Sequence, residues 1–149
     1  VLVSKGDVYI LDFDAEPARQ MAERRAKTSP LKDVAGMLRS FDYAASALVD
    51  RFEQRDPAHL EAIPPLAEAW RQVARRRFIE GYREHIDGCL AVPPETADFD
   101  RLLELFLIEK GIYEILYEAA NRPTWVAIPV RGVLGLLDTE QRSGLFSDG

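Results

Sequence analysis

Three acidic residues near the start of the chain have the type and spacing of a metal site. Asp12, Asp14 and Glu16 follow an apolar run in the sequence VYILDFDAEP. Side chains two residues apart share one face of an extended chain, so these carboxylates would lie together. Magnesium prefers hard oxygen ligands of this kind. A solvated acidic turn would show the same spacing, so the pattern leaves both interpretations open.

A second set of candidates shares one face of a helix that we predict at about residues 98–121. The first half of this helix carries an apolar stripe of Phe99, Leu102, Leu103 and Phe106. At about 100° per residue, polar and aromatic residues continue this stripe or lie beside it, namely Lys110, Tyr113, Glu114, Tyr117 and Asn121. The aliphatic side chains move to another face, which holds Leu105, Ile112, Leu116 and Ala119. The pattern predicts a helix that leaves the core to line a polar cleft.

This combination of side chains suits a sugar ligand. Tyrosine offers a flat apolar face together with a hydroxyl group, while lysine, glutamate and asparagine supply hydrogen-bond donors and acceptors. The alternative is an exposed surface on which Lys110 and Glu114 form an ion pair one turn apart, with the tyrosines half-buried. Periodicity alone does not separate a binding face from such a surface.

The elements that must position these residues begin with a hairpin and a long helix. Two β-rich runs at 1–4 and 7–12, joined by Lys5-Gly6, predict the hairpin. Ser29-Pro30 marks the start of a helix that runs to about residue 55, because serine caps helices and proline suits the first helical position.

The remaining elements are also expected to be helical. A second helix is predicted at 66–86, after a break at Pro64-Pro65. After residue 121 the chain closes in a short helix or loop that Pro129 interrupts. We therefore predict a mainly α fold in a single domain, with an N-terminal β-hairpin followed by a helical bundle.

Composition indicates a soluble domain that binds neither nucleic acid nor a membrane. The 149 residues are 47% hydrophobic and 30% charged, and the net charge of −6 disfavours a phosphate-binding surface. Arg75, Arg76 and Arg77 are consecutive, so on a helix they point in different directions and are expected on its solvated surface. No apolar run reaches the roughly 18 to 20 residues that span a bilayer. With a single cysteine, Cys89, and no signal peptide, a cytoplasmic location is expected.

Three segments resemble, in this order, the C-terminal half of bacterial maltokinases: VYILDFDAEP, ERRAKTSPLKDVAGMLRSFDYAA and EKGIYEILYEAANRPTWVAIPVRG. These enzymes share the fold of aminoglycoside phosphotransferases and protein kinases, and they often occur fused to trehalose synthase. The resemblance covers nearly the whole chain and implies a kinase-like C-terminal lobe. It implies a parent enzyme that phosphorylates maltose with ATP and Mg²⁺, giving maltose 1-phosphate in trehalose and α-glucan metabolism.

The resemblance also implies roles for individual residues. Asp12 matches the magnesium-binding aspartate of the kinase DFG position, with Asp14 and Glu16 as candidate second acids. Asp33 matches an aspartate at a helix start that supports the catalytic loop. The maltose-binding segment of the family matches a stretch with five candidate substrate-binding residues, Lys110, Tyr113, Glu114, Tyr117 and Asn121.

The sequence departs from the family pattern in two ways. Ala15 stands where the family usually has glycine, and alanine disfavours the positive φ that glycine permits. The HGD-type loop with the catalytic base, the glycine-rich phosphate loop and the N-lobe lysine are absent. We therefore expect no catalytic residue in this chain, which begins at Val1 without methionine. It is interpreted as a fragment that needs the N-terminal lobe of the same polypeptide for activity.

Two other functions stay open. The same fold could phosphorylate another small acceptor, such as a different sugar or an aminoglycoside, although a cationic acceptor would need clustered acids. The chain could instead be a non-catalytic helical module that binds another protein, such as a fused or associated trehalose synthase.

Overall fold

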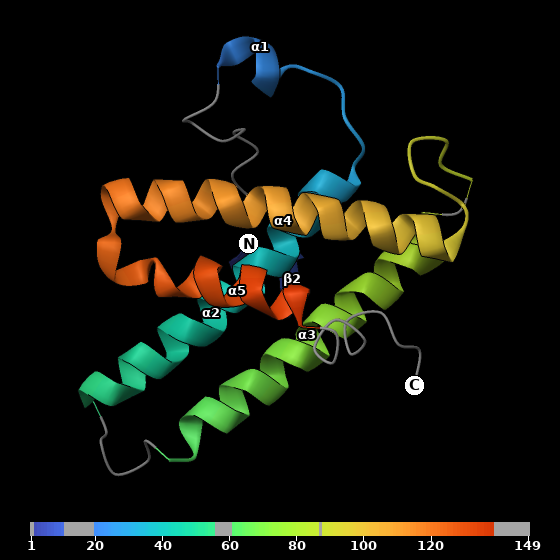
Figure 1. Ribbon diagram of the computed structural model, residues 1–149. Helices are drawn as coiled ribbons and strands as arrows, with labels where there is room; N and C mark the ends of the chain where they lie inside the picture. Colours follow the sequence, from blue (N-terminus) through green and yellow to red (C-terminus); the bar gives the residue numbers. More distant parts are fainter. Residues whose placement is uncertain (1, 11–19, 56–60, 87, 139–149) are drawn as a thin grey trace.

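The computed structural model describes residues 2–10, 20–55, 61–86 and 88–138. Two short strands, β1 (Leu2–Ser4) and β2 (Asp7–Tyr9), precede the helices. The helices are α1 (Met21–Arg24), α2 (Leu31–Arg55), α3 (Ile63–His85), α4 (Thr96–Asn121), the 3-10 helix η2 (Pro123–Trp125) and α5 (Ala127–Leu137) (Figure 1). The prediction of a mainly α fold, with a hairpin followed by a helical bundle, is confirmed. None of the described helices is long and apolar enough to cross a membrane.

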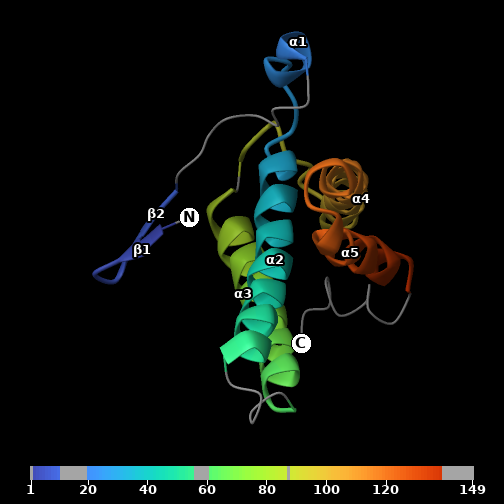
Figure 2. The same ribbon diagram turned by 90° about the vertical axis from the view of Figure 1, so that its left-hand side faces the viewer.

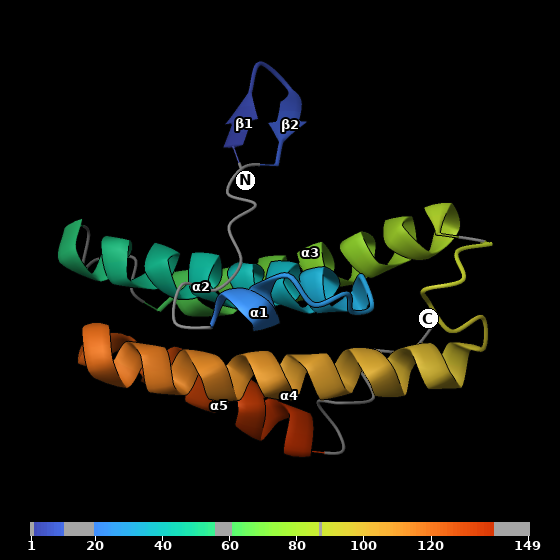
Figure 3. The ribbon, with the colours of Figure 1, turned by 90° about the horizontal axis from the view of Figure 1, so that it is seen from above.

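The long helices form two layers, with α2 at the centre (Figures 2 and 3). One layer holds α2 and α3 and the other holds α4 and α5, and α2 contacts all three of the other helices. The core between the layers is built from buried apolar side chains of these helices, including Leu31, Leu38, Ile79, Leu103, Leu107 and Leu136. In α2 and α4 such residues recur at three- and four-residue steps, so each helix buries one face.

The predicted hairpin is confirmed. Leu2 lies opposite Tyr9, and Ser4 lies opposite Asp7, in an antiparallel pair. The turn residues Lys5 and Gly6 both have positive φ, of 54° and 87°, as the tight turns of two-residue hairpins require. The second strand ends at Tyr9, and the predicted strand residues 11 and 12 lie outside the described part of the chain. The hairpin stands apart from the helices in Figure 3, and its strands are exposed.

Prolines lie in the first turns of α3 and α5 and do not break these helices. Pro64 and Pro65 are the second and third residues of α3, and Pro129 is the third residue of α5. Backbone N–H groups in a first helical turn have no acceptor within the helix, so proline loses no hydrogen bond there. The predicted second helix is therefore confirmed, but it begins at Ile63 and includes both prolines instead of following them, and the predicted interruption at Pro129 is wrong.

Ser29 places the start of α2 beside the loop that precedes α4. Its Oγ accepts a hydrogen bond from the N–H of Leu31 at 3.4 Å and donates one to the carbonyl of Ala91 at 3.0 Å. The predicted helix start at Ser29-Pro30 is confirmed, since α2 begins at Leu31. The start of α2 is thus bonded to the loop before α4, and the two helices pack together, with the middle of α2 against the second half of α4.

Candidate substrate-binding site

The residues expected to bind magnesium, Asp12, Asp14 and Glu16, lie outside the described residues, so the magnesium site stays a prediction. Within the described ranges, no group of three or more His, Cys, Asp or Glu side chains could hold a metal ion. Asp33 lies in the first turn of α2, and its side chain is exposed. Its expected support of a catalytic loop is therefore untested.

One line of buried residues runs along α4 and changes from apolar to polar. It consists of Phe99, Leu103, Leu107, Gly111, Glu114 and Glu118. The prediction that this helix leaves the core is wrong, because the buried face continues and carboxylates replace leucines on it. The aliphatic residues of the other face, Leu105, Ile112 and Leu116, are exposed. The predicted apolar stripe of the first half does lie at the core, since Phe99 and Leu103 are buried and Leu102 and Phe106 pack against them.

Glu114 points into the molecule, where Arg39 of α2 binds it. Its Oε2 accepts a hydrogen bond from Nε of Arg39 at 2.8 Å, and only 8% of the residue is exposed. Burial raises the pKa of Glu114, while the charge of Arg39 and its hydrogen bond oppose that shift. Glu114 is therefore not part of an exposed ion pair with Lys110, and it supports α4 from the inner side.

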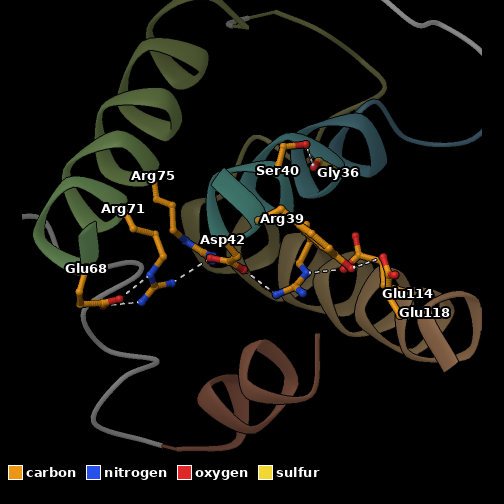
Figure 4. A network of polar contacts seen from close by, with 10 residues as sticks. Gly36, Arg39, Ser40, Asp42, Glu68, Arg71, Arg75, Glu114 and Glu118 are labelled. Atoms are coloured by element: carbon orange, nitrogen blue, oxygen red, sulfur yellow. Dashed lines mark hydrogen bonds and ion pairs between the residues drawn. The ribbon is translucent and has the colours of Figure 1, made fainter. Parts of the chain in front are cut away.

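Arg39 belongs to a charged network that joins α2, α3 and α4 (Figure 4). Its Nη1 donates to Oδ2 of Asp42 at 2.5 Å, and Oδ1 of Asp42 accepts from Arg71 at 2.9 Å and from Arg75 at 2.8 Å. Arg71 also forms two hydrogen bonds to Glu68, of 2.8 and 2.5 Å. Three arginines thus balance three acids, which limits the cost of burying Arg39, Asp42, Arg75 and Glu114, while Glu68 is exposed.

The three consecutive arginines have different surroundings. Arg76 and Arg77 are exposed, as predicted. Arg75 is buried against Asp42, so the prediction of a solvated side chain is wrong for this residue. Burial lowers the pKa of Arg75, and the charge of Asp42 opposes the shift.

Lys110, Tyr113 and Tyr117 form a row of stacked groups along α4, which we call the tyrosine row. Nζ of Lys110 lies 5.0 Å from the ring centre of Tyr113. The rings of Tyr113 and Tyr117 are nearly parallel, with their centres 6.2 Å apart. Asn121 donates a hydrogen bond to the carbonyl of Tyr117 at 2.8 Å. The structure therefore brings four of the five predicted substrate-binding residues together, while Glu114 lies beneath them.

Sequence reasoning missed a second buried acid next to this row. Glu118 is 1% exposed and accepts hydrogen bonds from Tyr43 at 3.0 Å and from Nε and Nη2 of Arg122 at 2.8 and 2.6 Å. Arg122 lies over the rings of Trp125, at 4.6 Å, and Tyr117, at 5.9 Å. The step of four residues from Glu114 to Glu118 was the signal in the sequence, since it places both acids on one face of a helix.

Stacked aromatic rings and cations thus extend from Lys110 to Trp125. Tyr43 of α2 completes this surface, because its ring stacks on Trp125 with centres 6.0 Å apart. Such a surface offers flat apolar faces next to hydroxyl, ammonium and guanidinium groups, the combination by which proteins bind polyhydroxylated ligands.

A separate hollow of about 470 Å³ lies between the loop that follows α3 and the start of α4. Its lining includes Arg83, Cys89, Val92, Thr96 and Phe99, and none of the predicted site residues. Arg83 is already paired with Asp100. The hollow is therefore separate from the tyrosine row.

Comparisons with known proteins place bacterial sugar kinases among the relatives of this chain. It is 28% identical over 137 residues to a glucosamine kinase of Streptacidiphilus jiangxiensis. The matched stretch covers 92% of this chain and 29% of that relative. It is 27% identical over 139 residues to a glucosamine kinase of Mycolicibacterium smegmatis. The matched stretch covers 93% of this chain and 32% of that relative. The chain thus spans about a third of the length of these relatives. No protein-family model and no solved structure matches it.

These relatives support the resemblance to sugar kinases in part. The similarity extends over nearly the whole chain, as the resemblance in the three segments implied. Neither of the two relatives is named a maltokinase, so a maltokinase in particular is not shown.

Proposed function

We propose that this chain is the substrate-binding, C-terminal part of an ATP-dependent sugar phosphotransferase, in which the tyrosine row and Asn121 contact the sugar. The observation that carries the proposal is the stacked arrangement of Lys110, Tyr113 and Tyr117 over buried acids. The names of the two relatives support a sugar as the acceptor.

In the proposed reaction, a sugar hydroxyl oxygen forms a bond to the γ-phosphorus of ATP while the bond from that phosphorus to the ADP oxygen breaks. Catalysis of this transfer rests on positioning and electrostatic stabilisation. Asp12 would hold Mg²⁺, with Asp14 and Glu16 as second acids, and Asp33 would support the catalytic loop. The catalytic base and the phosphate-binding lobe would come from the rest of the polypeptide.

The charges around the row favour a neutral sugar, and we propose maltose as the acceptor. Each buried acid of the described site is already paired with an arginine. Glu114 pairs with Arg39, and Glu118 pairs with Arg122. A cationic amino sugar would need an acid that is not already neutralised. Glucosamine is the second candidate, because the two relatives are named for it.

Steady-state kinetics of the complete protein tests the proposal. Lys110→Ala and Tyr117→Ala should each raise the KM for the sugar by roughly tenfold or more and leave the KM for ATP unchanged, since a lost polar contact costs about 1 to 3 kcal/mol. Maltose and glucosamine are each varied at fixed ATP. Arg77→Ala is the matched control, because that side chain is 73% exposed on α3.

Three outcomes would contradict parts of the proposal. Equal, small effects of all three variants on both constants would exclude the row as the sugar site. Turnover of glucosamine but not of maltose would replace the proposed acceptor. A complete protein that phosphorylates no sugar would favour the alternative of a non-catalytic interaction module, including one attached to a trehalose synthase.

A further inference from the structure

Arg39 is held on several sides by different helices. Within α2, its Nη1 bonds to Asp42, and across the layer its Nε bonds to Glu114 of α4. From α5, Gly132 leaves the space that the guanidinium fills, because a Cβ at this position would lie 1.8 Å from Nη1. The side chain is only 3% exposed, so atoms of these three helices surround it.

Glu114, the partner of Arg39, lies in the same turns of α4 as the tyrosine row. It is four residues after Lys110, one after Tyr113 and three before Tyr117. Side chains three and four apart on a helix are neighbours. A bond between Arg39 and Glu114 therefore constrains the rotation of α4 about its axis next to the row, in which Lys110 and Tyr113 are half-buried and Tyr117 is exposed.

Stability is a weak explanation for a buried pair of this kind. Removing two charges from water costs several kcal/mol, and well-packed apolar residues of similar volume are often as stabilising. Apolar contacts are non-directional, whereas the charge-assisted hydrogen bonds of a guanidinium add geometric specificity. Arg39 thus supplies orientation that the apolar core does not.

We infer that Arg39 is a positioning residue for the sugar site, acting through Glu114 to hold the tyrosine row in its binding arrangement. The inference rests on the proposed function, because the row must bind the sugar for its position to matter. Arg39 itself binds no ligand in this role. Its guanidinium also lies 5.9 Å from the ring centre of Tyr43, at the Trp125 end of the same surface.

Arg75 provides a matched comparison for Arg39. Both are buried arginines that bond to Asp42, and their side chains are 8% and 3% exposed. Only Arg39 reaches Glu114. A purely structural role predicts similar consequences for Arg39→Met and Arg75→Met, whereas a positioning role separates them.

The experiment compares these variants in the complete protein by thermal unfolding and by kinetics with each substrate varied in turn. Both methionine variants should lower the Tm. Only Arg39→Met should raise the KM for the sugar, by roughly tenfold to a hundredfold, with the KM for ATP unchanged, since small displacements of binding groups have effects of this size. Arg39→Lys keeps the charge and should fold, but it lacks the fixed fork of donors, so it should also raise the sugar KM.

Equal sugar KM values in Arg39→Lys and the unaltered protein would overturn the inference, as would equal increases in Arg39→Met and Arg75→Met. If Arg39→Met does not fold, Arg39→Lys alone decides. Failure of the proposed function looks different, because Lys110→Ala and Tyr117→Ala would then also leave the sugar KM unchanged. Effects of those two variants without an effect of Arg39→Lys would reject only the positioning role.

Discussion

Glu118 is the most deeply buried acid among the residues that the structure describes. Its carboxylate is satisfied by the hydroxyl of Tyr43 and by two donors of Arg122, so its burial leaves no unpaired charge. The buried carboxylate of Glu118 affects the pKa of its neighbour Tyr43. Burial raises the pKa of its phenol, the nearby charges of Glu114 and Glu118 and the hydrogen bond to Glu118 raise it further, and Arg39 opposes the shift.

This shift predicts an alkaline loss of stability. Above pH about 10, Tyr43 ionises in the unfolded chain but stays protonated in the folded one, so the unfolded state binds fewer protons and stability falls as pH rises. Tyr43→Phe removes this contribution. The variant should be less stable at pH 7 by about 1 kcal/mol, through loss of one hydrogen bond, and should lose less stability than the unaltered protein between pH 10 and 12.

Urea denaturation of the two proteins at pH 7, 10 and 11.5 measures the effect. An identical alkaline decline in both proteins would show that Tyr43 ionises as readily in the folded state as in the unfolded one.

At the scale of elements, two glycines allow α5 to pack closely on its neighbours. Gly111 of α4 faces Val133, since a Cβ there would lie 2.5 Å from Cγ2 of that valine. Gly132 of α5 faces the guanidinium of Arg39. Both glycines are helical, where the usual reason for glycine, a positive φ, does not apply. Space for the neighbouring helix is the physical requirement at both positions.

Alanine substitutions at glycines of the helices should therefore change the free energy of unfolding in different directions. Gly132→Ala should destabilise the protein by about 1 to 3 kcal/mol by overpacking, because the added methyl group must displace the guanidinium of Arg39. Gly111→Ala should cost about 1 to 3 kcal/mol by overpacking against a valine methyl. Gly36→Ala is the control and should stabilise by about 0.5 to 1 kcal/mol, since nothing lies within 4 Å of its Cβ position in α2.

Free energies of unfolding of the three variants test this order. A neutral Gly132→Ala would mean that Arg39 can move without losing its partners, which would also weaken its proposed positioning role.

At the scale of the whole molecule, the described helices form a two-layer bundle with a hairpin that stands apart from it (Figure 3). The large apolar side chains of the hairpin are exposed, among them Leu2, Val3, Val8 and Ile10. The chain also spans only about a third of its two relatives. These features fit the proposal that the remainder of a longer polypeptide supplies the phosphate-binding lobe.

The 149 residues alone should therefore not phosphorylate a sugar. We expect no transfer of phosphate from ATP to maltose or glucosamine in the presence of Mg²⁺, because positioned phosphates and a general base are both required. The measurement is product formation by the purified chain, with the complete protein as the positive control. Turnover by the chain alone would reject its interpretation as a fragment.

The sequence by itself determined the local structure. Lys5-Gly6 predicted the hairpin turn, Ser29-Pro30 predicted the start of α2, and the apolar period predicted α4, because turns, caps and amphipathic faces depend on residues close together in the chain. It also placed Lys110, Tyr113 and Tyr117 at neighbouring positions. The magnesium ligands Asp12, Asp14 and Glu16 remain predictions, since they lie outside the described residues.

Only the tertiary structure decided which side chains are buried. The burial of Glu114 depends on its hydrogen bond to Arg39, which is 75 residues earlier in the sequence. The burial of Arg75 depends on its hydrogen bond to Asp42, which is 33 residues earlier. Spacing along the chain can place two acids on one helix face, but it does not show which oppositely charged side chain of another helix will meet them, or that Arg75 and not Arg76 meets Asp42. Burying a charged side chain is costly unless a partner of opposite charge contacts it. The packing of α2 against α3 and α4 brings those partners into contact.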